Sequence, residues 1–216
     1  MACVGNDDDL RQVCTAPEGA FAGMQAGAIF VDHTTVSAAV TRELSALAGE
    51  RGLGFVDAPV SGGAAKAREG AISIMASGPE QAFRRIQPAL DAIAARVFRL
   101  GEEPGAGSRM KLINQLLAGV HIAAMAEAMV LAAKSGLDLA TVQDVIAECA
   151  GNSWMFQNRG PQVVRGDYTP FSAVDIFVKD LAGGGVVPFL SFVVEKRMTR
   201  VVRDELHRFP DAARRY

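Results

Sequence analysis

Short apolar runs alternate with helical stretches over the first half of the chain. The runs are four to six residues long, a length typical of buried strands, and they are Ala28–Asp32, Gly54–Asp57, Ala71–Ala76 and Arg96–Leu100. Between them, apolar residues recur at helical spacing, as in Val36, Val40, Leu44 and Leu47 and in Phe83, Ile86, Leu90 and Ile93. Ala2–Gly5 reads as the end of a further strand, and Asn6–Asp9 as the start of a helix. This alternation predicts an α/β domain with a largely parallel sheet.

The pattern changes to helices alone after Gly107. The run Leu116–Ala133 is apolar nearly all the way round, which is typical of a helix buried in a core. Further helices are predicted from Asp138, from Asn152 and over Phe171–Leu181, the first with Val142, Val145, Ile146 and Cys149 facing inward. We therefore expect an α/β domain over residues 1–104, followed by an all-α domain over residues 105–216 built on a long central helix.

Composition and charge narrow the classes of partner. A net charge of −2 argues against nucleic acid or an anionic membrane as the main partner. Three cysteines without a CxxC pair indicate a reduced, cytoplasmic protein, and three scattered histidines indicate no metal site. The run Leu116–Ala133 is long enough to span a membrane. Because it contains His121 and Glu127 and is rich in alanine, we interpret it as a core helix of a soluble domain.

Four stretches carry side chains suited to chemistry. Lys111 and Asn114 are three positions apart and share one helix face, although a solvated first turn has the same pattern. Ser61-Gly62-Gly63 lies between a strand and a helix, where glycines let backbone N–H groups approach an anion, but such turns are common. Thr34 and Thr35 follow a strand, either at a ligand site or as a helix cap. Lys179 and Asp180 are either site residues or a surface pair.

Taken together, these stretches resemble one family. Asp57-Ala-Pro-Val-Ser-Gly-Gly63, Gly107-Ser-Arg-Met-Lys-Leu-Ile-Asn-Gln115, Lys179-Asp180-Leu181 and Asp32-His-Thr-Thr35 resemble, in order and spacing, the β-hydroxyacid dehydrogenases. That family includes 3-hydroxyisobutyrate, tartronate semialdehyde and threonate-type dehydrogenases, and the resemblance runs from about Cys3 to Leu181. It implies a partial Rossmann-like parallel sheet in the first domain and hydride transfer between a small 3-hydroxy acid, or a related sugar acid, and NAD or NADP. It also implies a homo-oligomer formed through the helical domain.

The resemblance assigns roles residue by residue. Lys111 matches the catalytic lysine, a general acid/base whose ordinary pKa of about 10.4 burial would have to lower. The positions that match substrate contacts are Ser61, Gly62, Gly63 and Asn114, and those that match cofactor contacts are Val4, Gly5, Asp9, Thr35 and Lys179.

The sequence departs from the family pattern in two places. Family members begin with a strand and a glycine fingerprint for the dinucleotide, and this chain starts just past them. Gly105-Ala-Gly107 does not replace the fingerprint, because Met110 occupies its third glycine position. After Leu181 the chain continues with Ala-Gly-Gly-Gly185 and a divergent tail over 185–216, where the family has a long helix.

The alternative hypothesis is therefore an inactive truncated remnant or pseudoenzyme that only associates through its helical domain. Imine reductases are a lesser alternative, because they generally replace the lysine.

Overall fold

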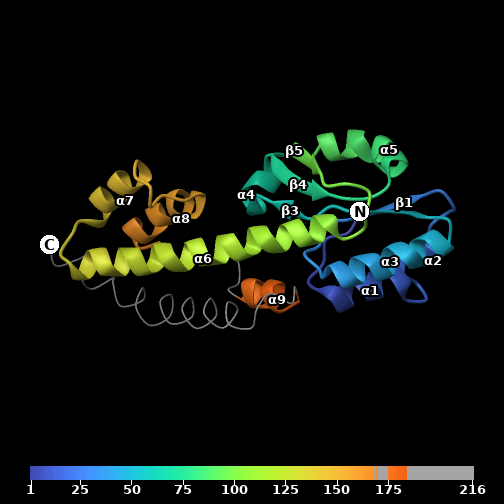
Figure 1. The fold of residues 1–216 in the computed structure, drawn as a ribbon, viewed down its shortest axis with the longest axis horizontal. Helices are drawn as coiled ribbons and strands as arrows, with labels where there is room; N and C mark the ends of the chain where they lie inside the picture. The colour runs from blue at the N-terminus through green and yellow to red at the C-terminus, as the bar shows by residue number, and fades with distance from the viewer. Residues whose placement is uncertain (168, 170–174, 184–216) are drawn as a thin grey trace. The chain divides into compact units, whose positions relative to one another are not determined.

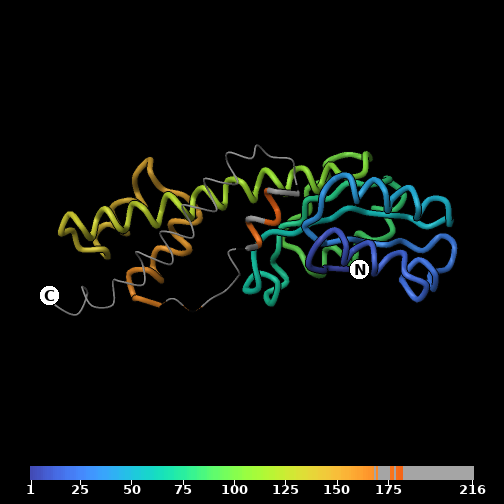
Figure 2. Tube along the Cα trace, turned by 90° about the horizontal axis from the view of Figure 1, so that it is seen from below, coloured from blue at the N-terminus to red at the C-terminus, as the bar shows by residue number. Residues whose placement is uncertain are grey.

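The computed structural model in Figure 1 describes residues 1–167, 169 and 175–183. Contacts within the chain divide it into two compact units, Met1–Asn114 and Gln115–Tyr216. The division falls inside one continuous helix, α6 (Ala106–Lys134), which Figure 2 shows as a single tube. The domain boundary expected between residues 104 and 105 stays a prediction. The predicted tail over 185–216 and residues 171–174 of the predicted helix lie outside the described residues.

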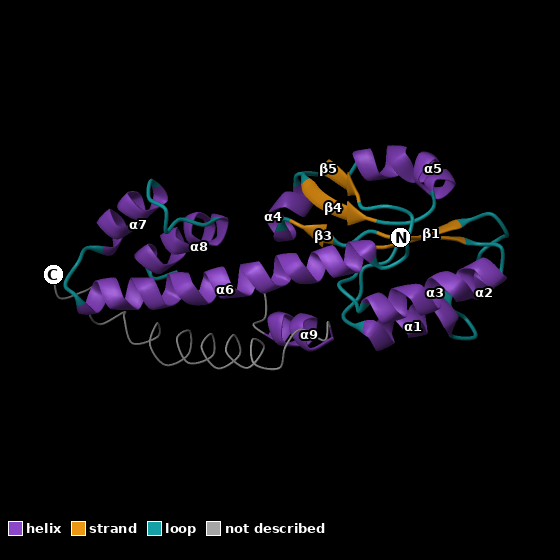
Figure 3. Ribbon diagram, in the orientation of Figure 1, coloured by secondary structure: helices purple, strands orange, loops and turns teal. Residues whose placement is uncertain are grey.

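The first unit contains short strands, coloured orange in Figure 3. Strands β1 (Ile29–Asp32) and β2 (Gly54–Asp57) pair in parallel, with Asp32 directly opposite Asp57. Strand β4 (Ile72–Ala76) pairs in parallel with β5 (Ala94–Arg99) and antiparallel with β3 (Val60–Ser61). An isolated bridge between Asp57 and Ser77 connects the two sheets. The predicted parallel strands are confirmed. Strand β3 was not predicted, and its residues were expected to belong to a turn, because a strand of two residues shows no periodicity.

Helices cover both faces of these strands. The helices are α1 (Asp7–Thr15), α2 (Ala20–Gly23), α3 (Ala38–Glu50), α4 (Gly63–Arg68) and α5 (Glu80–Asp91). Successive strand residues point to opposite faces: Phe30 and Phe55 pack with Leu44 of α3, while Val31 and Val56 pack with Phe83 of α5. The predicted cap of the first helix is confirmed, because the Asn6 side chain accepts a hydrogen bond from the Asp9 N–H. The α/β class of the first unit is therefore confirmed.

The second unit is helical, with α7 (Leu139–Ala147), α8 (Trp154–Arg165) and α9 (Asp175–Gly183) following α6. Asp138 caps α7 by accepting from the Thr141 N–H, and Ser153 caps α8 by accepting from the Phe156 N–H. Phe156 of α8 packs against Met125 and Met129 of α6. Leu181 of α9 belongs to a separate cluster with Ala118 and Ala123 of α6.

Two burial predictions are wrong. The run Leu116–Ala133 of helix α6 is not buried all round, because Leu117, Val120 and Leu131 are 51%, 37% and 66% exposed. On α7, Val145 is 54% exposed, and the Cys149 side chain just beyond the helix is also exposed. An apolar residue is compatible with burial but does not require it, so hydrophobic periodicity alone could not separate these positions. By length and composition, α6 meets the criteria for a membrane-spanning helix, and a third of its most apolar window is buried.

Candidate active site

A buried carboxylate holds the start of α6 against the ends of the strands. The Asp57 side chain, at the carboxyl end of β2, is 0% exposed. Its Oδ2 accepts from the Ser108 N–H at 2.8 Å and from the Ser77 hydroxyl at 3.1 Å, and its Oδ1 accepts from the Ser108 hydroxyl at 2.8 Å. Burial raises the pKa of the Asp57 carboxyl above its ordinary value, while hydrogen bonds from Ser108, Ser77 and the Gly105 backbone oppose that rise.

Two glycines allow this close approach. A Cβ at position 107 would clash with the Met75 carbonyl oxygen and would lie 2.9 Å from Asp57 Oδ2. Gly105 has φ +89°, a left-handed conformation that disfavours other residues, and a Cβ there would meet Ala38 at 3.0 Å. These glycines therefore serve helix–strand packing, which agrees with the rejection of Gly105-Ala-Gly107 as a nucleotide fingerprint.

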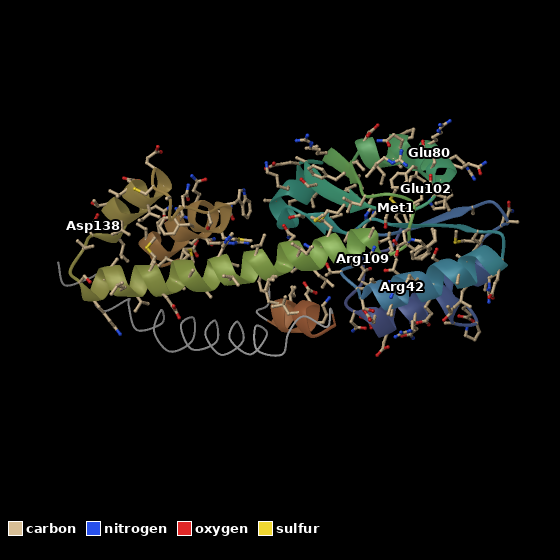
Figure 4. All side chains as sticks on the ribbon, in the orientation of Figure 1. Met1, Arg42, Glu80, Glu102, Arg109 and Asp138 are labelled. Carbon is tan, nitrogen blue, oxygen red and sulfur yellow. The ribbon has the colours of Figure 1, made fainter. Side chains whose placement is uncertain are left out.

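Lys111 lies one helical turn beyond Ser108 on α6. Its side chain is only 7% exposed, and Asn114, three residues later, is half-buried. The open alternative, a solvated first turn, is thus wrong for Lys111. The solvent side of this turn carries Arg109, labelled in Figure 4, which forms an ion pair with Glu103 at 3.5 Å. A buried amine is rare on a protein surface helix and marks Lys111 as a candidate for chemistry.

The turn Ser61-Gly62-Gly63 connects β3 to α4. Gly62 and Gly63 have φ +132° and +68°, so both adopt conformations that glycine supplies without strain. Ser61 pairs with Ser73 of β4, and Met75, two residues further along the same strand, contacts Gly107. Strand β4 therefore connects this turn to the beginning of the helix that carries Lys111.

The candidate cofactor residues of the first unit gather at the carboxyl end of β1. The Val4 N–H donates to the Thr34 hydroxyl at 3.1 Å, which places the Val4–Gly5 segment beside Thr34 and the half-buried Thr35. The Asp9 carboxylate lies close to Gly5, where an added Cβ would be 2.6 Å from Asp9 Oδ2. Four of the five predicted cofactor positions thus lie on two neighbouring segments: Val4, Gly5 and Asp9 on the first, and Thr35 on the second.

Asp32 and His33 are buried beneath the carboxyl end of β1 and form hydrogen bonds there. Asp32 is 0% exposed and accepts from the Thr34 N–H at 2.9 Å through Oδ1. Burial raises the pKa of Asp32 to about 6, although its hydrogen bonds from Thr34 act in the opposite direction. His33 is buried with Nδ1 2.7 Å from the Ala58 carbonyl oxygen, and burial lowers its pKa. His33 is therefore a structural residue that joins the ends of β1 and β2.

Lys179 lies in the second unit on α9. Its Nζ is 2.9 Å from Asp180 Oδ1, and the Asp180 side chain is fully buried. The other oxygen, Asp180 Oδ2, accepts from the Gln115 side-chain amide of α6 at 2.7 Å. The side chain of Lys179 is 35% exposed, so it remains partly accessible to solvent.

Sequence reasoning assigned no role to Asp57, Ser77 or Ser108, although all three belong to the network that holds α6. The available signal was an aspartate at the end of a predicted strand, but hydrogen-bond partners 20 and 51 residues away cannot be paired from a single sequence. Among the described residues, no group of three or more His, Cys, Asp or Glu side chains is arranged to hold a metal ion.

Family comparisons match the chain in two consecutive parts. Residues 1–101 match the NAD binding domain of 6-phosphogluconate dehydrogenase. Residues 105–183 match a region described as NAD-binding of NADP-dependent 3-hydroxyisobutyrate dehydrogenase. The chain is 50% identical to the L-threonate dehydrogenase of Escherichia coli O6:H1 over 181 residues, which are 84% of this chain and 60% of that protein. The chain therefore spans about 60% of the length of the curated relatives it matches.

Solved structures give the same relationship. The 3-hydroxyisobutyrate dehydrogenase from Salmonella typhimurium superposes with a TM-score of 0.82 at 46% identity, over 94% of this chain and 73% of that chain. The structure of Psf3 in complex with NADP+ and 2-OPP superposes with a TM-score of 0.83 at 25% identity, over 94% of this chain and 74% of that one.

Proposed function

Because this chain belongs to the β-hydroxyacid dehydrogenase family, we propose that it acts in NAD(P)-dependent oxidation of a small 3-hydroxy acid or related sugar acid, with Lys111 as the general acid/base. The observation that carries the proposal is the burial of Lys111, 7% exposed, on a helix whose first turn is held by Asp57. Burial limits the contact of Lys111 with water, and a fixed helical turn limits the orientations of its side chain toward a substrate. Relatives named L-threonate and 3-hydroxyisobutyrate dehydrogenase support substrates of this class.

The chemistry requires a base for one proton and an acceptor for one hydride. Lys111 Nζ, in its neutral form, takes the proton of the substrate hydroxyl as the carbon–oxygen bond becomes a carbonyl. Nicotinamide, when bound, supplies the hydride acceptor. Ser61 offers a hydroxyl and the Gly62–Gly63 turn offers backbone N–H groups to the substrate carboxylate, while the Asn114 amide orients the reacting hydroxyl.

The residues of the first unit fit one part of a dinucleotide. Thr35 and the backbone at Val4 and Gly5 offer neutral hydrogen-bonding groups, and the exposed Asp9 carboxylate can accept from ribose hydroxyls. The start of α1 does not fit a pyrophosphate, because Asp7, Asp8 and Asp9 occupy its first turn and Asn6 already caps it. We therefore propose that these residues contact the nicotinamide riboside part of NAD or NADP. Lys179 interacts with the negatively charged part of the cofactor.

A self-association surface is a further part of the proposal. Met110, Ile113, Leu117, Val120 and Leu131 lie on α6 at three- and four-residue intervals, with a longer step before Leu131, and all five are at least 37% exposed. Below, these five residues are called the α6 stripe. An apolar helix face of this length favours burial against a second helix. We propose that the stripe mediates homo-oligomer formation and that the protein acts in the cytoplasm.

The proposed activity is tested by following reduced nicotinamide when the 216-residue chain is mixed with NAD+ or NADP+ and L-threonate or 3-hydroxyisobutyrate. Lys111→Ala should lower kcat by about 100-fold or more, the usual loss when a general base is removed. Lys66→Ala is the matched control, because Lys66 is an exposed lysine whose ammonium forms an ion pair with Glu69 at the surface. It should leave kcat unchanged.

Binding separates the two hypotheses. Titration of NADH and NADPH by fluorescence should show saturable binding that Lys111→Ala preserves and Lys179→Ala weakens. Absence of both binding and turnover in the wild-type chain would favour the inactive remnant instead. Turnover that survives Lys111→Ala would overturn the assignment of the general base.

A further inference from the structure

Helix α6 begins without a capping side chain of its own. The first N–H groups of a helix have no partner within it and usually bond to a Ser, Thr, Asp or Asn side chain at the residue before the helix. That residue is Gly105, which has no side chain to offer. Two residues of the first turn, Gly107 and Ser108, are buried, Ser108 at 1% exposure, so solvent cannot replace the missing cap at their N–H groups.

Side chains from the strand ends supply the cap. The Gly107 N–H donates to the Ser77 hydroxyl at 3.1 Å, and the Ser108 N–H donates to Asp57 Oδ2 at 2.8 Å. Ser77 in turn donates to Asp57 Oδ2, so both N–H groups are connected to one carboxylate. This arrangement also places a negative charge at the positive end of the helix dipole.

The network holds the helix in rotation as well as in position. The Ser108 hydroxyl donates to Asp57 Oδ1 at 2.8 Å and lies 3.0 Å from the Thr41 hydroxyl of α3. Ser108 is therefore held from β2 on one side and from α3 on the other. Lys111 is three residues further along, on the same side of the helix as Ser108.

We propose that Asp57 is a positioning residue for Lys111: a carboxylate from β2 that caps α6 in trans through Ser108 and Ser77 and so fixes the helical turn that carries the amine. The inference rests on the proposed function for the importance of Lys111 in turnover. The positioning itself rests only on contacts within the first unit.

The experiment compares the reactivity of Lys111 with that of Lys66 in the same sample. Trace acetylation with acetic anhydride, followed by mass spectrometry of the peptides, gives the ratio of the two labelling rates. Asp57→Asn keeps the shape of the side chain but replaces one acceptor oxygen by an NH2 group. This group is a donor and cannot accept the hydrogen bonds that Ser77 and Ser108 donate to the carboxylate. It should raise the Lys111-to-Lys66 labelling ratio at least about threefold at temperatures where circular dichroism shows the fold intact.

A matched control is available in the neighbouring strand. Asp32 is equally buried and lies directly opposite Asp57, but its carboxylate accepts from the Thr34 N–H at the end of its own strand. Asp32→Asn should leave the labelling ratio unchanged. Ser108→Ala should raise the ratio in the same direction as Asp57→Asn, and it decides the outcome if Asp57→Asn does not fold. An unchanged ratio in Ser108→Ala and in folded Asp57→Asn would overturn the inference.

Turnover distinguishes the two proposals. If both are correct, Asp57→Asn lowers kcat about tenfold or more with a smaller change in the KM for the hydroxy acid. The reason is that the substitution displaces the base Lys111 and leaves the substrate contacts in place. If only the proposed function fails, either the wild type shows no turnover or Lys111→Ala retains it, while the labelling ratio still responds to Asp57→Asn. If only the positioning fails, Lys111→Ala loses turnover while Asp57→Asn changes neither the ratio nor kcat.

Discussion

Asp32 and Asp57 are neighbours across two paired strands, and both are fully buried, yet their surroundings differ. Asp57 accepts from three donor groups of Ser77 and Ser108, which compensate for the loss of hydration. Asp32 accepts from the Thr34 N–H, and its Oδ2 has no hydrogen-bond partner within the described residues. The difference explains why burial raises the pKa of Asp32 as far as about 6.

The raised pKa of Asp32 predicts that this residue contributes to stability in a pH-dependent way. Between the unfolded pKa of about 3.9 and the folded value of about 6, the folded chain holds a proton that the unfolded chain has lost. The contribution of Asp32 to the free energy of unfolding should therefore fall as pH rises through this window. Asp32→Asn removes the titration, so its stability relative to the wild type should increase by about 2 kcal/mol between about pH 4 and pH 7.

Urea unfolding of both proteins at several pH values measures this difference. Thr41→Ser is a suitable control, since it alters a buried position of the same unit without removing a titrating group. A difference between Asp32→Asn and the wild type that stays constant across the window would contradict the role of burial at Asp32.

At the scale of the element, the decisive feature is how closely α6 docks on the strands. The helix starts where its backbone contacts the Met75 carbonyl oxygen and the Asp57 carboxylate, and any side chain at position 107 would occupy that contact. The neighbouring atoms are strand backbone and a hydrogen-bonded carboxylate, so they cannot move aside without breaking the network.

Gly107→Ala should therefore lower the free energy of unfolding by about 2–4 kcal/mol, in the range of severe overpacking, and should lower turnover with it. Gly49→Ala is the matched control. It makes the same substitution inside helix α3, where an added Cβ meets nothing within 4 Å, and it should stabilise the protein by about 0.5–1 kcal/mol. Thermal melts of the two variants measure both effects, and equal stability of the two would contradict the docking described for α6.

At the scale of the whole molecule, the α6 stripe predicts association between chains. Leu117→Glu and Leu131→Glu place charges at two exposed positions of the stripe and should shift a homo-oligomer to monomer, with an apparent dissociation constant at least about 100-fold higher. Val145→Glu is the control, because Val145 is 54% exposed on α7 and lies off the stripe. Size-exclusion chromatography with light scattering measures the mass, and a monomeric wild type would contradict the stripe as an association surface.

Much of the architecture was predictable because the underlying signals are local. Strands β1, β2 and β4 follow from short apolar runs, and the start of α7 from the capping preference of Asp138. The two-residue strand β3 and the exposed face of α6 were not predictable, because a strand of two residues has no period and an alanine-rich apolar helix has no polar face to mark its solvent side.

Residue types and their spacing along the chain were enough to predict the α/β-to-helical order, the family, and the candidate residues Lys111, Asn114 and Ser61–Gly63. The folded chain was needed to see that Asp57 caps α6, that Lys111 is buried, and that Val4 lies beside Thr34. The physical reason is that a buried polar group takes its hydrogen-bond partner from whatever the fold brings within reach. For Asp57 that partner is 51 residues away along the chain.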